Sequence, residues 1–259
     1  MRRGTVIVAV TAVAVLLTVA TAGGELIQEG NLRVSFDGSF APKSLPRDRP
    51  APITVAVEGA VATTDGSRPP VLQEVEIGIS RNGLISTRGL PTCTTSRLQS
   101  TTTEQALERC RDARVGSGSF EARIDFPGAQ PVPAHGKVLA FNGEAGGKPA
   151  LLLQLYSESP VRIAFVVPLK IESRPKEKFG TVLSTRLPTL AAGSATVTQI
   201  KLKLGRTYSY RGERRGFISA SCSAPTGFTA GIFAFARGNF RFSDGKTVRV
   251  ALTRDCRVR

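Results

Sequence analysis

The chain has 259 residues, of which 41% are hydrophobic and 21% charged, and its formal net charge is +15. This composition excludes a disordered chain, a multi-span membrane protein, a collagen and a coiled coil. A single His, four Cys and no Trp leave few residues for metal or acid–base chemistry. The composition therefore limits the fold class but does not point to a specific activity.

Residues 1–22 have the pattern of a secretory signal. Arg2 and Arg3 precede an apolar run over residues 5–19, and Ala20-Thr21-Ala22 supplies small residues for cleavage. The alternative is an uncleaved anchor, since residues 5–22 approach the length needed to cross a bilayer. In either case the two arginines stay on the cytoplasmic side, which predicts a secreted or extracytoplasmic protein.

Short runs with alternating apolar residues dominate the rest of the chain, and this pattern is typical of half-buried strands. They occur at 53–57, 75–79, 137–141, 151–155, 162–167, 197–204, 206–210, 216–221, 231–236 and 248–252. Asn82-Gly83 and Asp244-Gly245 are placed to form hairpin turns. The pattern predicts an all-β fold, either a sandwich or a barrel, and we favour a sandwich-like architecture.

One segment favours a helix instead. Residues 101–104, Thr-Thr-Thr-Glu, offer a capping box, and helix formers follow over residues 105–113. We expect one short helix here.

A Pro- and Gly-rich stretch at 126–136 has no alternating run, so it predicts a boundary between two β-sandwich-like domains. After the signal segment these would span residues 23–130 and 131–259. A sandwich of this total length can also form one domain.

The four cysteines predict two disulfides, since an even count in an exported chain usually pairs. Of the three connectivities, we favour Cys93–Cys110 and Cys222–Cys256, because each bridge then lies within one half of the chain. A zinc or redox site is the alternative, but the sequence has no C-x-x-C motif and only one His. We therefore expect no metal site and no cofactor.

Charge is distributed unevenly along the chain. Residues 23–130 carry 12 Lys and Arg against 13 Asp and Glu, whereas residues 131–259 carry 21 against 7. The candidate anion-binding residues are Lys201, Lys203, Arg206, Arg211, Arg214 and Arg215. A concentrated field of one sign attracts polyanions, although such a face can also serve solubility alone.

Candidate catalytic groups are few. Any Ser-His-acid or Cys-His device must use His135, which lies in the predicted linker. Glu74 and Glu76 share a strand face but are typical of a solvated sheet edge. We assign no catalytic residue.

The residues Gly89-Leu90-Pro91-Thr92-Cys93, Ala106-Leu107, Cys110, Ala113, Val115-Gly116 and Gly118 resemble secreted proteins of high-GC Gram-positive bacteria that have no assigned activity. The resemblance covers about thirty residues and implies export and a paired-cysteine loop. It transfers no catalytic residue and no ligand.

We therefore predict an exported, disulfide-bonded binding or envelope-structural protein with a basic C-terminal surface. Its expected partners are an anionic cell-wall polymer or an anionic membrane surface, without specific nucleic-acid recognition. The alternative is a secreted hydrolase whose acidic catalytic residues the sequence does not identify.

Overall fold

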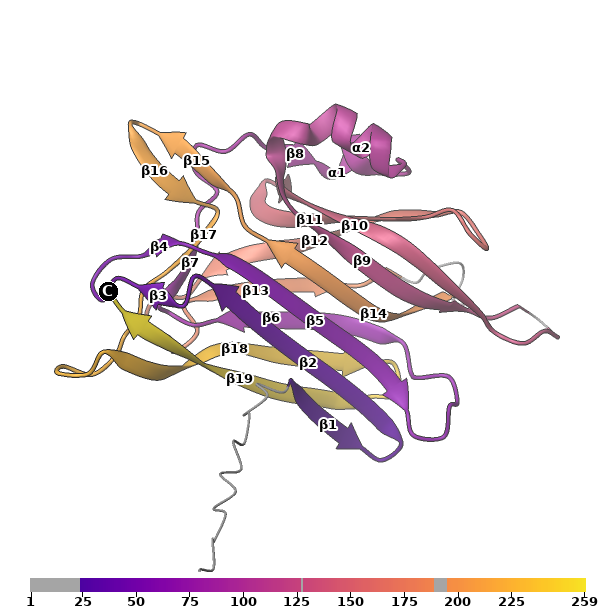
Figure 1. Ribbon diagram of the computed structural model, residues 1–259. Coiled ribbons are helices and arrows are strands. Elements are labelled where there is room, and N and C mark those ends of the chain that lie inside the picture. Colours follow the sequence, from indigo (N-terminus) through magenta and orange to yellow (C-terminus); the bar gives the residue numbers. More distant parts are fainter. Residues whose placement is uncertain (1–23, 127, 189–194) are drawn as a thin grey trace, which may run out of the picture.

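A computed structural model of the chain describes residues 24–126, 128–188 and 195–259, so the predicted signal segment lies outside the described residues. The fold is one large curled sheet with a small helical cover (Figure 1), which confirms the all-β class. In spatial order its strands are β1 (Glu25–Glu29), β2 (Leu32–Ala41), β5 (Thr54–Thr63), β14 (Ala195–Leu204), β9 (Arg114–Ile124), β10 (Val132–Ala145), β11 (Lys148–Ser157), β12 (Ile163–Ser173), β13 (Thr181–Arg186), β6 (Leu72–Ile79), β18 (Ala230–Phe242), β19 (Thr247–Val258) and β3 (Ser44–Leu45), with β8 (Cys93–Thr94) paired to β10 beside this path.

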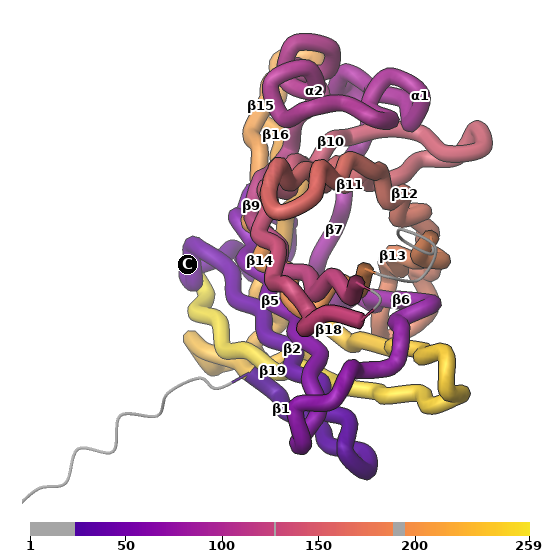
Figure 2. The backbone as a smooth tube through the Cα atoms, turned by 90° about the vertical axis from the view of Figure 1, so that its right-hand side faces the viewer, coloured from indigo at the N-terminus to yellow at the C-terminus, as the bar shows by residue number. Residues whose placement is uncertain are grey.

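The two ends of the sheet meet, so the sheet encloses its own inner face (Figure 2). After β2 the chain forms β3, which pairs in parallel with the end of β19. Arg254 of β19 donates a 2.6 Å hydrogen bond to the carbonyl of Gly38 on β2 and forms an ion pair with Asp37. Because strands alternate their side chains, each strand contributes every second residue to the enclosed core.

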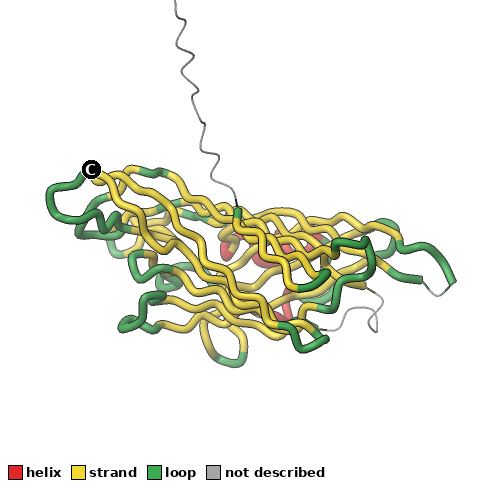
Figure 3. The backbone as a smooth tube through the Cα atoms, turned by 90° about the horizontal axis from the view of Figure 1, so that it is seen from below, coloured by secondary structure: helices red, strands yellow, loops and turns green. Residues whose placement is uncertain are grey.

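One end of the curled sheet is closed by a three-stranded sheet of β4 (Ala51–Pro52), β17 (Ile218–Ala220) and β7 (Gly83–Ile85). Phe217 and Ile218 are buried there and join the inner core. The Cys222–Cys256 disulfide ties the segment after β17 to β19. Figure 3 shows the strands running along the long dimension of the molecule, with connecting loops at both ends.

The helical cover consists of α1 (Thr95–Leu98), α2 (Thr103–Cys110) and a 3₁₀ turn at Arg111–Ala113. It lies against the outer face of β10, β11 and β12, where Leu98 and Ala106 pack with Phe141, Leu152 and Val166. The Cys93–Cys110 disulfide holds this cover to β8. The central strands are therefore apolar on both faces.

The helical prediction needs two corrections. The described part of the chain contains two short α-helices instead of one, since α1 was not predicted. The capping box uses Thr102 and Gln105, whose side chains each accept a hydrogen bond from the other's backbone N–H, at 3.3 and 3.1 Å. Thr101 is excluded from it because its hydroxyl donates to the carbonyl of Leu98, 2.6 Å away.

Every predicted strand overlaps an observed one, but one predicted hairpin is wrong. β7, which follows Asn82, pairs with β17, while β6 lies between β13 and β18. The chain leaves the sheet after Ser80, whose N–H donates to Phe235 on β18. The second hairpin, β18–β19 around Gly245, is confirmed, and Gly245 has the positive φ of +84° that its turn requires.

The predicted boundary at 130/131 falls in the connection of the β9–β10 hairpin. Strands from the two stretches are interleaved, since β5 pairs with β14 and β6 lies between β13 and β18. One inner core includes residues of both stretches. The described residues are therefore not divided into two sandwich-like units there, because turn-forming residues mark a hairpin connection as readily as a linker.

Both predicted disulfides are confirmed, with 17 residues of sequence separation in Cys93–Cys110 and 34 in Cys222–Cys256. In the chain-entropy model, loops of these sizes stabilise the fold by about 3 and about 4 kcal/mol.

We predict that Cys222→Ser/Cys256→Ser lowers the free energy of unfolding more than Cys93→Ser/Cys110→Ser does. The first pair closes the end of the inner core, whereas the second holds only the helical cover. Urea denaturation followed by far-UV circular dichroism measures both. A larger loss from the Cys93 and Cys110 variant would contradict this assignment.

Candidate functional site

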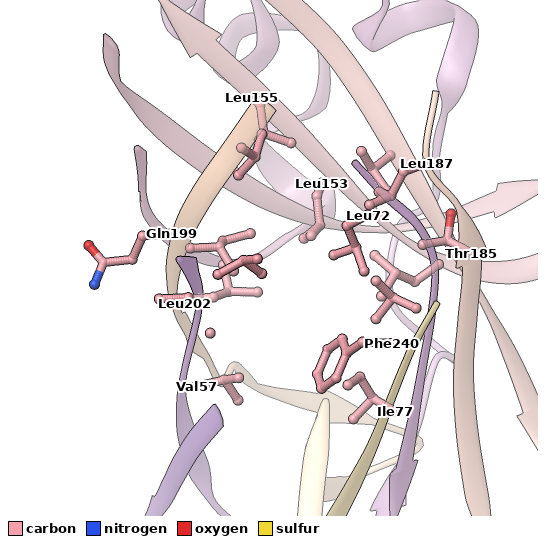
Figure 4. Close-up of a pocket in the computed structure, with 18 of the residues that line it drawn as sticks. Val57, Leu72, Ile77, Leu153, Leu155, Thr185, Leu187, Gln199, Leu202 and Phe240 are labelled. Atoms are coloured by element: carbon pink, nitrogen blue, oxygen red, sulfur yellow. The ribbon is translucent and has the colours of Figure 1, made fainter. Parts of the chain in front are cut away.

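Side chains do not completely fill the inside of the curled sheet (Figure 4). A cavity of about 240 Å³ remains between β2, β5 and β14 on one side and β6, β11, β12, β13 and β18 on the other. For comparison, an engineered apolar cavity of ~150 Å³ stays dry and binds benzene. The space is therefore large enough for part of an organic ligand.

The cavity lining is aliphatic and carries no formal charge. Among the described residues that line it there is no Asp, Glu, Lys, Arg or His, and the aromatic ones are Phe36, Phe165 and Phe240. Gln199 points its amide away from the cavity in Figure 4 and donates a 2.8 Å hydrogen bond to Glu58. A charged group would find no counter-ion inside this lining, so the cavity suits an uncharged apolar group.

Part of this lining is not covered by other side chains. Leu151 is only 2% exposed, but Val57, Leu72, Ile77 and Leu202 remain partly exposed although they face the same interior. Exposed apolar surface costs about 25 cal/mol per Å². An apolar occupant would remove this cost.

Two features shape the cavity. Phe36 and Phe240 meet edge to face at its wall, with ring centroids 5.7 Å apart. On β5, Gly59 leaves space, because a Cβ there would come no closer than 3.8 Å to Ile200 and 3.9 Å to the carbonyl of Ser35. Gly59 therefore marks a position where a larger side chain would enter the cavity.

The cavity extends toward the end of the sheet opposite β4, β17 and β7. Its lining there includes Val71, Leu187 and Pro188, which lie in connections next to strand ends, and Ala195, the first residue of β14. The closed end and the cavity thus lie at opposite ends of one core.

The structure distributes the six predicted anion-binding residues over two places. Lys201 and Lys203 are exposed on the outer face of β14, as predicted, where they line a shallow depression of about 390 Å³. Asp37 and Glu58 line the same depression, and Lys201 lies 3.3 Å from Glu58. Cations and acids therefore share this part of the surface.

The other four residues follow β14 in the chain. Arg206 donates hydrogen bonds to the carbonyls of Asp112 and Arg114 at 2.5 and 3.1 Å. Arg211, Arg214 and Arg215 belong to the hairpin of β15 (Thr207–Tyr210) and β16 (Glu213–Gly216), which projects from the main sheet in Figure 1.

Within this hairpin, Tyr210 organises two of the cations. The guanidinium groups of Arg211 and Arg215 lie 5.4 and 5.2 Å from the centre of its ring. Arg215 also hydrogen-bonds Glu213 at 2.7 Å, which raises the pKa of Arg215. Lys203, Arg211 and Arg214 have no ion pair with any described residue.

The candidate catalytic groups do not come together. His135 is exposed on β10, with its Nδ1 4.0 Å from Glu121. Glu74 lies 2.8 Å from Arg186 and 3.6 Å from Arg241, and Glu76 lies 3.4 Å from Arg237. The expectation of a sheet edge was wrong for both glutamates, because β6 is an interior strand and its outward carboxylates pair with arginines on its neighbours.

Comparison with protein-family models, curated proteins and solved structures finds no match to this chain. None of the helices within the described ranges is long and apolar enough to cross a membrane. The only signal of this cavity in the sequence is the alternation that faces Val57, Ile77 and Leu202 inward, and alternation alone does not predict a cavity.

We predict that Gly59→Phe stabilises the ligand-free protein by about 2 kcal/mol, because its ring fills open apolar space inside the cavity and is itself buried there. For a chain of this size the melting temperature should rise by about 4–8 °C. Ala62→Phe is the matched control, since Ala62 is exposed on the same strand. Equal shifts in the two variants would argue against an unfilled interior at Gly59.

Proposed function

We propose that the protein is a binding protein that holds an aliphatic hydrocarbon chain inside its curled sheet. The observation that carries this proposal is the apolar cavity, whose lining has no charged residue among those that the structure describes. Ligand sites are typically concave and mostly apolar, and they occur preferentially inside closed sheets and at similar enclosed positions.

The lining favours an aliphatic ligand over an aromatic or charged one. Its inward side chains are mainly Val, Leu and Ile, which conform to a flexible chain, and they offer no ring pair between which an aromatic ligand would stack. A polar end group would have to lie outside this lining, because burying it unpaired is unfavourable. We therefore take the ligand to be a lipid-like molecule.

The two disulfides fit this function. They are characteristic of proteins that fold in an oxidising compartment. Hydrocarbon chains are poorly soluble in the aqueous spaces of such a compartment, so a protein that encloses them keeps them in solution.

The test uses cis-parinaric acid, an acyl chain that fluoresces in apolar surroundings. We expect the parent protein to bind it and to release it when dodecanol is added, because recognition requires no charged end group. Gly59→Phe should weaken binding by about tenfold or more, while Ala62→Phe should bind as the parent does. Unchanged binding by Gly59→Phe would mean that the acyl chain binds outside this cavity, and it would overturn the proposal.

We propose as a second function that the basic residues after β14 contact an anionic membrane surface. The supporting observation is the projecting β15–β16 hairpin, where Arg211 and Arg214 have no ion pair with the described residues. Basic residues near an anionic surface each contribute about 1 kcal/mol.

Two triple variants test whether vesicle binding depends on particular cations or on the net charge alone. Lys203→Gln/Arg211→Gln/Arg214→Gln removes cations without an ion pair. Lys201→Gln/Arg206→Gln/Arg215→Gln removes the same charge from side chains that are ion-paired or hydrogen-bonded to backbone carbonyls. At low salt, sedimentation with phosphatidylglycerol-containing vesicles should fall by about a hundredfold for the first variant only. Equal losses of vesicle binding in the two variants would mean that net charge alone causes the effect. If the parent protein binds anionic wall polymer but not vesicles, the polymer is the partner instead.

A further inference from the structure

The two most exposed large apolar side chains of the described residues lie close together in sequence. Ile232 is 80% exposed at the start of β18, and Phe228 is 65% exposed in the turn before it. Here β18 extends past β6, which pairs with it only from Ala236 onward. Single exposed apolar residues are common, but this pair occupies one projecting end of the sheet.

The segment that carries Phe228 is held firmly. Arg47 donates hydrogen bonds to the carbonyls of Ala224, Pro225 and Phe228, the last at 2.8 Å. The Cys222–Cys256 disulfide anchors its beginning. A Cβ at Gly231 would lie 2.9 Å from the Cα of Ala224, so the turn packs directly on the strand. These contacts hold the backbone around Phe228 in place, so its side chain stays exposed and does not fold back onto the protein.

Basic residues surround this apolar pair. The N–H of Val258 donates to the carbonyl of Thr229, and the N–H of Arg259 donates to that of Leu45. The C-terminal residues and the segment around β3 therefore border the turn. Together, residues 42–50, 222–232 and 255–259 carry five basic residues, Lys43, Arg47, Arg49, Arg257 and Arg259, against two acidic ones, Asp48 and Asp255.

We infer that this end of the molecule docks on an anionic lipid bilayer, with Phe228 and Ile232 entering the interfacial region. The inference deepens the second proposed function, since the β15–β16 hairpin and the C-terminus lie at the same end of the molecule (Figure 1). Exposed apolar side chains among cations match an anionic bilayer, which offers hydrocarbon beneath negative headgroups.

Docking in this way also orients the cavity. The cavity extends toward the opposite end of the sheet, away from β4, β17 and β7. The bound protein therefore presents the ligand-holding end to the aqueous phase, which suits transfer of the ligand to a further partner.

The absence of Trp from the chain allows a direct test. Phe228→Trp gives the protein one indole at the docking end, and Leu26→Trp gives the control one indole at a similarly exposed position on β1. On adding phosphatidylcholine vesicles that contain phosphatidylglycerol, we expect a blue shift of emission and quenching by brominated lipid for Phe228→Trp only. Equal responses at the two positions would overturn the inference.

A second measurement separates insertion from charge attraction. Phe228→Ser/Ile232→Ser should lower the vesicle partition coefficient by about tenfold at high salt, where charge attraction is screened. The triple variant Lys203→Gln/Arg211→Gln/Arg214→Gln should lose binding mainly at low salt. Loss in this triple variant with no indole shift at Phe228→Trp would leave the second proposed function standing and overturn insertion. No vesicle binding by the parent would overturn both.

Discussion

The fold depends on closing one sheet upon itself. β3 continues the path of β2 and pairs with β19, and Arg254 joins the same two strands farther along. Once the ends meet, every strand has an inside and an outside, so alternate residues must be apolar along nearly the whole chain. This constraint explains why alternation is the dominant pattern of the sequence.

Closure also determines where empty space remains. At one end Phe217 and Ile218 fill the interior from a separate small sheet. Toward the other end none of the described residues makes such an insertion, and side chains as short as Val57 and Val75 do not reach across the space. The cavity therefore follows from the combination of a wide closed sheet and a filling that covers only one end.

Local patterns predicted the fold class, most strands and both disulfides, because alternation and cysteine spacing are properties of the sequence itself. They failed where a strand pairs with strands that are distant from it in the sequence. Asn82-Gly83 has hairpin chemistry, yet both edges of β6 are occupied by β13 and β18, which lie far along the chain. The cavity was not predictable for a related reason. Alternation shows that Val57 and Ile77 face inward, but it does not show whether the two walls touch.

The charged residues, too, are arranged differently in the fold than along the sequence. The basic excess of residues 131–259 suggested a separate basic domain, but the interleaved strands bring many of these cations to acids of the first stretch, as in Arg186–Glu74, Arg237–Glu76 and Lys201–Glu58. Such exposed pairs add little to stability, since each contributes about 0–1 kcal/mol. Their effect is to neutralise the outer wall of the sheet. Arg211, Arg214 and Arg257, which have no ion pair with the described residues, lie toward the end that carries Phe228 and Ile232. Closure of the sheet thus brings part of the basic excess of the second stretch beside acids of the first and leaves other cations without such a partner.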